Sequence, residues 1–233
     1  MHHLFKALLF LLLACNPLFS APKGAFLVCI DPGHPSETSD GAAVNGLSEN
    51  HLNWEVAERL AAKLKAKGIP FVLTKTSEKQ RVTNRERADI ANGANSHKMP
   101  CSAFIRLHCD TGGGTGFMWY YPDRSGTKAG VTGPPEEVRI ASRRLAETMN
   151  EAMKPVLKGV LRANEIRTDA QTFVGGNQGG VLTGSIFARV PTALVEMCFI
   201  NNKGDAEMIA SAAGQEKMAE ALLAGILAWK AAH

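Results

Sequence analysis

Val28-Cys29-Ile30-Asp31-Pro32-Gly33-His34 decides the fold of this chain, because it joins an apolar run to a Pro-Gly turn that carries a histidine. Short apolar runs bounded by turn residues are typical of buried strands. Functional residues in α/β proteins gather where such strands end, so His34 is expected at the mouth of a sheet. Gly46-Leu47-Ser48-Glu49 then begins a helix, and Ala103-Phe104-Ile105-Arg106-Leu107-His108 ends a second apolar run. Two histidines and one carboxylate are the ligand set of a hydrolytic zinc ion with one open position.

The order of the remaining elements predicts the fold class. After the N-cap Ser48, four apolar residues repeat every four positions, and Gly68 ends the helix before a strand at 71–73. Strand, helix and strand in this order favour a right-handed parallel crossover. Further helices are expected at 84–94, 136–153, 205–210 and 215–230, and further strands at 116–121 and 192–199. Ala94 is expected on the apolar side of the first of these helices and Ile140 on that of the second. We therefore predict one α/β domain over 24–233, with three layers and a mostly parallel twisted sheet flanked by helices.

The first twenty residues indicate export. A short basic start is followed by an apolar segment, 7–14, that is too short to span a membrane. Cleavage after Ser20 is expected. Leu12-Leu13-Ala14-Cys15 also resembles a bacterial lipobox with Cys15 as the lipidated residue, and a plain signal peptide that contains a cysteine is the alternative. The expected location is the periplasm or cell envelope, with a membrane tether if Cys15 is lipidated.

Charge and cysteine content exclude other classes of protein. The net charge of +4 is too small to indicate a nucleic-acid partner. The chain has no Cys-x-x-Cys pair, so a thiolate zinc site is not expected. Export permits disulfides. Even so, Cys29, Cys101, Cys109 and Cys198 lie in or beside predicted core strands, so buried free thiols are the expectation.

Glu196 is the second informative residue, since it interrupts the apolar strand predicted at 192–199. A carboxylate in such a place is costly unless it is paired or bound to a metal. It is either held by a core arginine or functional, and its nearness to the strands that end at His34 and His108 favours function. Asp31 either orients His34 or caps the turn.

Three surface features are assigned from composition. Arg81, Arg85 and Arg87 give the helix at 84–94 a basic start, for which a solvated or salt-bridged face is the main expectation and contact with a substrate carboxylate the alternative. The Gly/Pro/Ser-rich segment 123–135 is a candidate for a short lid. Gly175 to Gly180 is expected to be a mobile surface loop.

From about Ala25 to Trp229 the chain resembles the zinc-dependent N-acetylmuramoyl-L-alanine amidases, a cell-wall hydrolase class often called amidase 3. The matching pieces are Ile30-Asp31-Pro32-Gly33-His34, Gly46-Leu47-Ser48-Glu49, Arg85 to Asn92, Ile105-Arg106-Leu107-His108 and Leu194 to Asn202. Two departures concern substrate detail. Pro35-Ser36 stands where the family usually has glycines, and Cys109-Asp110 stands where it usually has Ala-Asn.

The resemblance implies His34, Glu49 and His108 as zinc ligands and Glu196 as the catalytic acid/base. It also implies the substrate, which is the peptidoglycan amide that joins the lactyl group of N-acetylmuramic acid to the L-alanine of the stem peptide. Zinc in such a site lowers the pKa of bound water toward ~7 and polarises the carbonyl. A glutamate that moves the proton typically contributes ~10²–10⁴-fold.

Two alternatives stay open at this point: a zinc peptidase that acts within the stem peptide, and a catalytically silent wall-binding protein. The complete set of four residues argues against silence. A monomer is expected. Because no separate wall-binding domain is evident, targeting is expected to come from the catalytic domain, from a lipid on Cys15 or from an activator protein.

Overall fold

The computed structural model describes residues 26–233. The predicted signal segment 1–20, including Cys15, lies outside the described residues. Within the described part, no helix combines the length and the apolar character that a membrane span requires.

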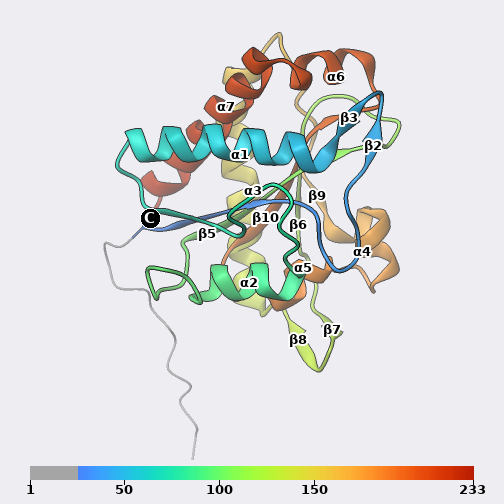
Figure 1. Cartoon of the computed structure of the whole chain (residues 1–233). Helices are drawn as coiled ribbons and strands as arrows, with labels where there is room; N and C mark the ends of the chain where they lie inside the picture. The colour runs from blue at the N-terminus through green and yellow to red at the C-terminus, as the bar shows by residue number, and fades with distance from the viewer. Residues whose placement is uncertain (1–25) are drawn as a thin grey trace, which may run out of the picture.

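A six-stranded sheet forms the centre of the domain (Figure 1). Its order is β4-β1-β5-β10-β6-β9, and only the β10–β6 pair is antiparallel. The strands of this sheet are β1 (Val28–Pro32), β4 (Phe71–Leu73), β5 (Ala103–Asp110), β6 (Met118–Tyr121), β9 (Arg167–Thr168) and β10 (Thr192–Phe199). Two small hairpins lie outside it: β2 (Ala43–Val44) with β3 (Leu47–Ser48), and β7 (Gly126–Lys128) with β8 (Val131–Gly133). The mostly parallel sheet that the sequence predicts is confirmed.

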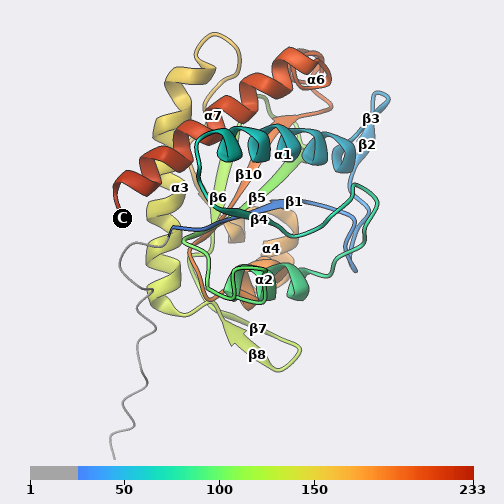
Figure 2. The ribbon, with the colours of Figure 1, turned by 60° about the vertical axis from the view of Figure 1, so that its left-hand side comes forward.

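Helices cover both faces of this sheet, so the domain has three layers (Figure 2). One face carries α1 (Glu49–Ala66), α3 (Glu136–Leu157) and α7 (Ala212–Ala231). The other carries α2 (Asn84–Asn92) and α5 (Thr183–Phe187). The remaining helices are a 3₁₀ turn (Asp169–Gln171), α4 (Phe173–Asn177) and α6 (Lys203–Ala210).

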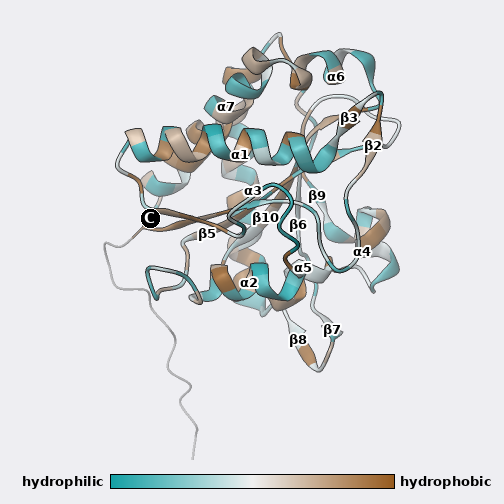
Figure 3. Ribbon diagram, viewed as in Figure 1, coloured by the Kyte–Doolittle hydropathy of each residue, from teal (hydrophilic) through white to brown (hydrophobic). Residues whose placement is uncertain are grey.

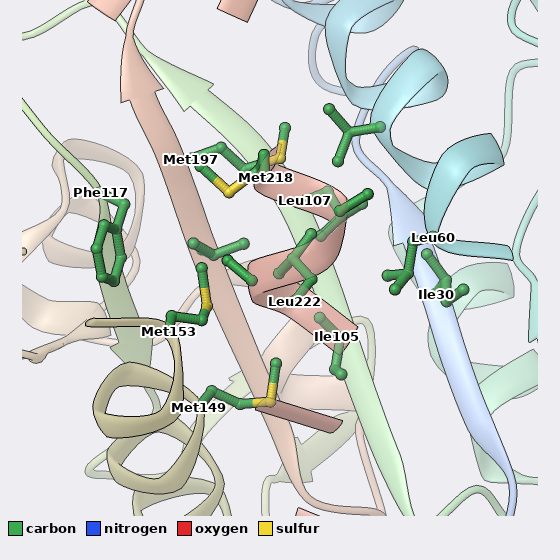
Figure 4. Close-up of a cluster of buried hydrophobic side chains, with 14 of the residues drawn as sticks. Ile30, Leu60, Ile105, Leu107, Phe117, Met149, Met153, Met197, Met218 and Leu222 are labelled. Atoms are coloured by element: carbon green, nitrogen blue, oxygen red, sulfur yellow. The ribbon is translucent and has the colours of Figure 1, made fainter. Parts of the chain in front are cut away.

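Side chains along the central strands point alternately to the two faces of the sheet, and this separates the core from the site. On β5, Ile105 and Leu107 point toward α1, α3 and α7, where they meet methionines and leucines of α3 and α7 (Figure 4). Successive side chains of a strand point to opposite faces, so Arg106 and His108 lie on the side of α2 and α5. Glu196, which pairs with His108 in the β5–β10 register, lies on that same side. The apolar character of the central strands is visible in Figure 3. The same two-residue alternation thus places apolar side chains in the large core on one face of the sheet and the polar groups on the opposite face.

Three sequence expectations need correction. Ile140 of α3 is 50% exposed, because the buried stripe of this helix runs through Val138, Leu145 and Met149 instead. On α2, Ala94 lies beyond the end of the helix and is exposed, whereas Arg87 is buried. Gly175 to Gly180 is not simply a loop. Gly175 and Gly176 belong to the short helix α4, which begins where the Thr172 hydroxyl accepts a hydrogen bond from the Gly175 amide.

The four cysteines of the described part are free and buried, as expected. Cys109 on β5 and Cys198 on β10 lie side by side, with their sulfur atoms 3.8 Å apart. They belong to the core beneath the site.

Candidate active site

His34 follows directly after the turn that ends β1, and its backbone is unusual. Its φ of 62° lies in the left-handed region that side chains other than glycine seldom adopt. The ring packs against Gly41, where an added Cβ would come within 3.1 Å of it. Its Nδ1 lies 3.3 Å from the Ser39 carbonyl oxygen. A proton on Nδ1 can be donated there, which leaves Nε2 as the free ligand atom.

Buried side chains hold the backbone of this turn, because every carbonyl of 32–35 accepts a hydrogen bond. Arg87 donates to the carbonyls of Pro32 and Pro35 at 2.9 Å each, Asn53 donates to Gly33 at 3.3 Å, and Lys75 donates to His34 at 2.5 Å. Sequence reasoning missed Lys75 and Asn53. Lys75 is 1% exposed, and burial followed by the charge of Arg87 lowers its pKa to about 8. Its position two residues after the end of β4 was the available signal.

Glu49 joins the two histidines at the start of α1. Its Oε1 atom lies 3.2 Å from His34 Nε2 and 3.0 Å from His108 Nδ1. Its Oε2 atom accepts a hydrogen bond from the Ala42 amide at 2.9 Å, which fixes the carboxylate plane. The histidine rings stand edge to face, with centroids 4.9 Å apart. The structure thus brings together the three ligands that the sequence analysis proposed.

The donor set fits a divalent metal. One ligand atom from each residue lies within 4.8 Å of the others, which suits a tetrahedral ion with bonds of about 2.0–2.2 Å. His108 Nε2 is buried without a hydrogen-bond partner among the described residues. Burial lowers the pKa of His108 to about 4, so the ring is neutral at pH 7, as a ligand must be. Burial alone would raise the pKa of Glu49, but hydrogen bonds from His108 and His34 outweigh it and hold that pKa well below its usual range.

Glu196 faces this cluster from β10 and has no arginine partner in the described part of the chain. Its Oε2 atom is buried and has no hydrogen-bond partner among residues 26–233. Burial, followed by the charges of Glu49 and Asp110, raises the pKa of Glu196 well above its usual value. A carboxyl group in this environment can take up and hold a proton near neutral pH. The alternative of a glutamate held by a core arginine is therefore not what the structure shows.

The role expected for Asp31 is wrong in both of its forms, since Asp31 neither contacts His34 nor caps the turn. It is fully buried and binds Thr74 at 2.6 Å, Arg106 at 2.8 Å and Arg87. This network anchors Arg87, which in turn holds the Pro32–Pro35 turn. Asp31 therefore acts on the site through Arg87.

The other two arginines at the start of α2 are exposed and paired. Arg81 contacts Asp40, and Arg85 lies 3.8 Å from Asp89 one helical turn away. Neither lines the groove described below. The main expectation, a solvated or salt-bridged face, is confirmed for these two arginines, whereas Arg87 is buried.

A groove of about 1100 Å³ contains the cluster and Glu196. Its walls come from the 34–42 segment, the glycine-rich turn 111–115, the 162–167 segment and α4. No residue of the predicted lid, 123–135, lines it. That segment forms the β7–β8 hairpin, which packs against α5 outside the groove. The lid expectation is wrong for this reason.

The fold and site define a single-domain α/β protein with a His-Glu-His cluster in an open groove, beside a glutamate that has no ion-pair partner in the described part of the chain. A family model described as N-acetylmuramoyl-L-alanine amidase matches residues 28–228. The chain belongs to this family, whose members are typically zinc-dependent.

Named relatives agree with this membership. The chain is 28% identical over 209 residues to the N-acetylmuramoyl-L-alanine amidase LytC of Bacillus subtilis (strain 168), a match that covers 87% of this chain but only 35% of LytC. It is 27% identical to the N-acetylmuramoyl-L-alanine amidase Rv3717 of Mycobacterium tuberculosis, with 93% of each covered. Among solved structures, the N-acetylmuramoyl-L-alanine amidase AmiC2 of Nostoc punctiforme is 25% identical with a TM-score of 0.65, covering 88% of this chain and 96% of AmiC2.

Proposed function

We propose that the protein hydrolyses the amide between N-acetylmuramic acid and the L-alanine of the peptidoglycan stem peptide, with zinc held by His34, Glu49 and His108. The observation that carries this proposal is the approach of all three ligand side chains to one point, in a groove that also contains Glu196. Zinc at this point would activate a water molecule and polarise the amide carbonyl.

The chain's own residues supply the rest of the chemistry. Glu196 would accept the proton of the attacking water and deliver it to the departing amine of L-alanine. Its raised pKa suits this exchange, because a carboxylate with an ordinary pKa would be a weak acid catalyst at neutral pH. The ion pairs and hydrogen bonds behind the Pro32–Pro35 turn keep His34 in its strained conformation, so the ligands are preorganised.

The substrate places the reaction in the cell envelope, outside the cytoplasm. Four expectations remain predictions: cleavage after Ser20, a lipid on Cys15, an activator protein and a monomeric state. Mass spectrometry of the mature protein separates the two export routes. A chain that begins at Cys15 with acyl groups supports the lipobox, and one that begins at Ala21 contradicts it.

The function is tested by the new amino termini that appear in a cell-wall digest. Purified protein should be incubated with sacculi, and the released amines labelled and identified. We expect L-alanine as the labelled residue, with release abolished by a chelator and restored by zinc. Termini at another residue of the stem would indicate a peptidase, and no release at all would indicate a silent binder.

A further inference from the structure

Two arginines line the groove at the end away from the metal ligands. Arg162 and Arg167 are exposed, and neither has an ion-pair partner among residues 26–233. Both border the same groove as Glu196. We propose that Arg162 and Arg167 bind a free carboxylate of the stem peptide, so that the peptide runs from the cluster across β6 toward β9. This inference rests on the proposed function.

The sheet register places Arg167 on the face of the site. Arg167 pairs with Tyr120 on β6, and Tyr120 pairs with Leu194 on β10, two residues before Glu196. Paired residues of neighbouring strands point to the same face, so Arg167 and Glu196 share one side of the sheet. The Arg167 guanidinium also lies beside the Tyr120 side chain, where its charge opposes the rise in the pKa of Tyr120 that burial causes. Its charged end therefore lies over β6 rather than away from the groove.

The distance suits a peptide substrate. β9 lies three strands from β5, which at ~4.8 Å per strand is roughly 14 Å. Two to three extended residues span about 7–11 Å, and a flexible arginine side chain reaches back over the remaining distance. The carboxylate in question therefore belongs to the second or third residue of the stem, counted from the scissile amide.

The backbone that carries the first arginine is fixed. The Arg162 carbonyl accepts a hydrogen bond from the Phe117 amide at 2.9 Å, and the Asn164 side chain donates to the carbonyls of Thr115 and Phe117. Gly116 makes this approach possible, since an added Cβ would lie 2.1 Å from the Arg162 oxygen. A fixed backbone reduces the entropy lost when the side chain binds a ligand.

Charge distribution along the groove gives the peptide its direction. Arg87 and Arg106 also line the groove, but both are buried and paired with Asp31. The lining acids are Glu49, Asp110 and Glu196, all at the metal end. A substrate carboxylate is repelled from that end and attracted to the guanidinium groups of Arg162 and Arg167. The contact with a substrate carboxylate, considered above for the arginines at the start of α2, fits these two residues better.

The test compares variants on two substrates. Arg162→Gln, Arg167→Gln and the double variant are assayed with muramyl tripeptides whose stem carboxylates are either free or amidated. Arg144→Gln is the matched control, because Arg144 is an exposed arginine of α3 that does not line the groove. We expect KM for the free carboxylate to rise about five- to ten-fold in each single variant, with kcat within about two-fold. Arg167→Lys, which keeps the charge, should recover part of the loss.

Amidation of the substrate should raise the wild-type KM by a similar factor. On the amidated substrate, the variants should show little further increase in KM over the wild type. The inference is overturned if amidation leaves the wild-type KM unchanged, or if the variants keep the KM of Arg144→Gln. It is also overturned if the variants lose only kcat. Calorimetric titration of Glu196→Gln with both tripeptides measures the same preference without turnover. If the wild type cleaves nothing, the proposed function fails, and this titration still decides whether the carboxylate site exists.

Discussion

Asp31→Asn tests how strongly the buried ion network supports the site. The substitution keeps the shape of the side chain and removes its charge. In the wild type, Asp31 is fully buried between Arg87 and Arg106 and also accepts a hydrogen bond from Thr74. The variant leaves two buried guanidinium groups without a counter-charge. Removal of one partner from a buried ion pair costs about 3–5 kcal/mol, so we expect that loss in the free energy of unfolding and a decrease in Tm of roughly 6–20 °C.

The pH dependence of the same variant has a definite sign. Burial alone would raise the pKa of Asp31, but the charges of Arg87 and Arg106 hold it well below its usual range. A group with a depressed folded-state pKa stabilises the protein above its unfolded pKa, ~3.9, and loses that effect as the pH falls below it. The difference between wild type and Asp31→Asn should therefore be constant from pH 7 to about 4 and should narrow in more acidic solution.

Urea unfolding, followed by fluorescence, measures these differences. Asp40→Asn is the control, since Asp40 forms an ion pair with Arg81 but its side chain is 74% exposed. An exposed pair contributes about 0–1 kcal/mol. If Asp31→Asn is no more destabilised than Asp40→Asn, or if the difference widens below pH 4, the reasoning about the buried network is refuted.

Three further predictions concern the cluster and a second buried acid. His108→Ala should lose zinc and activity together, because two remaining ligands hold the ion poorly; stoichiometric zinc by elemental analysis would contradict its role as a ligand. Glu196→Gln should keep zinc while turnover falls by at least ~10²-fold, and loss of the metal would make Glu196 a ligand. Asp169 is buried, which raises its pKa to about 6, so the wild type should lose stability as the pH rises from about 4 to 6. In Asp169→Asn, the free energy of unfolding should change less between pH 4 and 6 than in the wild type. If it changes by the same amount, Asp169 is not the group responsible.

The sequence indicated the elements whose signal is local. The sequence pattern correctly predicted the apolar strands β1, β5 and β10. It also predicted the turn before His34 and the start of α1 at Glu49. Glu196 was informative because an unpaired acid in an apolar strand has few structural explanations. These features depend on neighbours in the chain or on the face of a strand, which a sequence displays directly.

The missed features depend on partners far apart in the chain. Arg87 is buried only because Asp31, 56 residues earlier, neutralises its charge. The residues next to Arg87 in the sequence do not predict that contact. Lys75 is buried for a similar reason, since its partners include the carbonyl of His34, 41 residues earlier. The cationic end of the groove depends on the pairing of β9 with β6, and β9 is only two residues long, too short for a sequence pattern to predict it.

The central claim is that His34, Glu49 and His108 hold zinc while Glu196 stays outside the ligand set to move the proton. Anomalous diffraction at the zinc absorption edge tests this most directly, with crystals of zinc-loaded Glu196→Gln that contain an uncleaved muramyl peptide. We predict one strong peak within about 2.0–2.2 Å of a nitrogen of each histidine and an oxygen of Glu49, with the lactyl amide beside it and residue 196 unbound. A peak elsewhere in the groove, or one bonded to residue 196, would contradict the account.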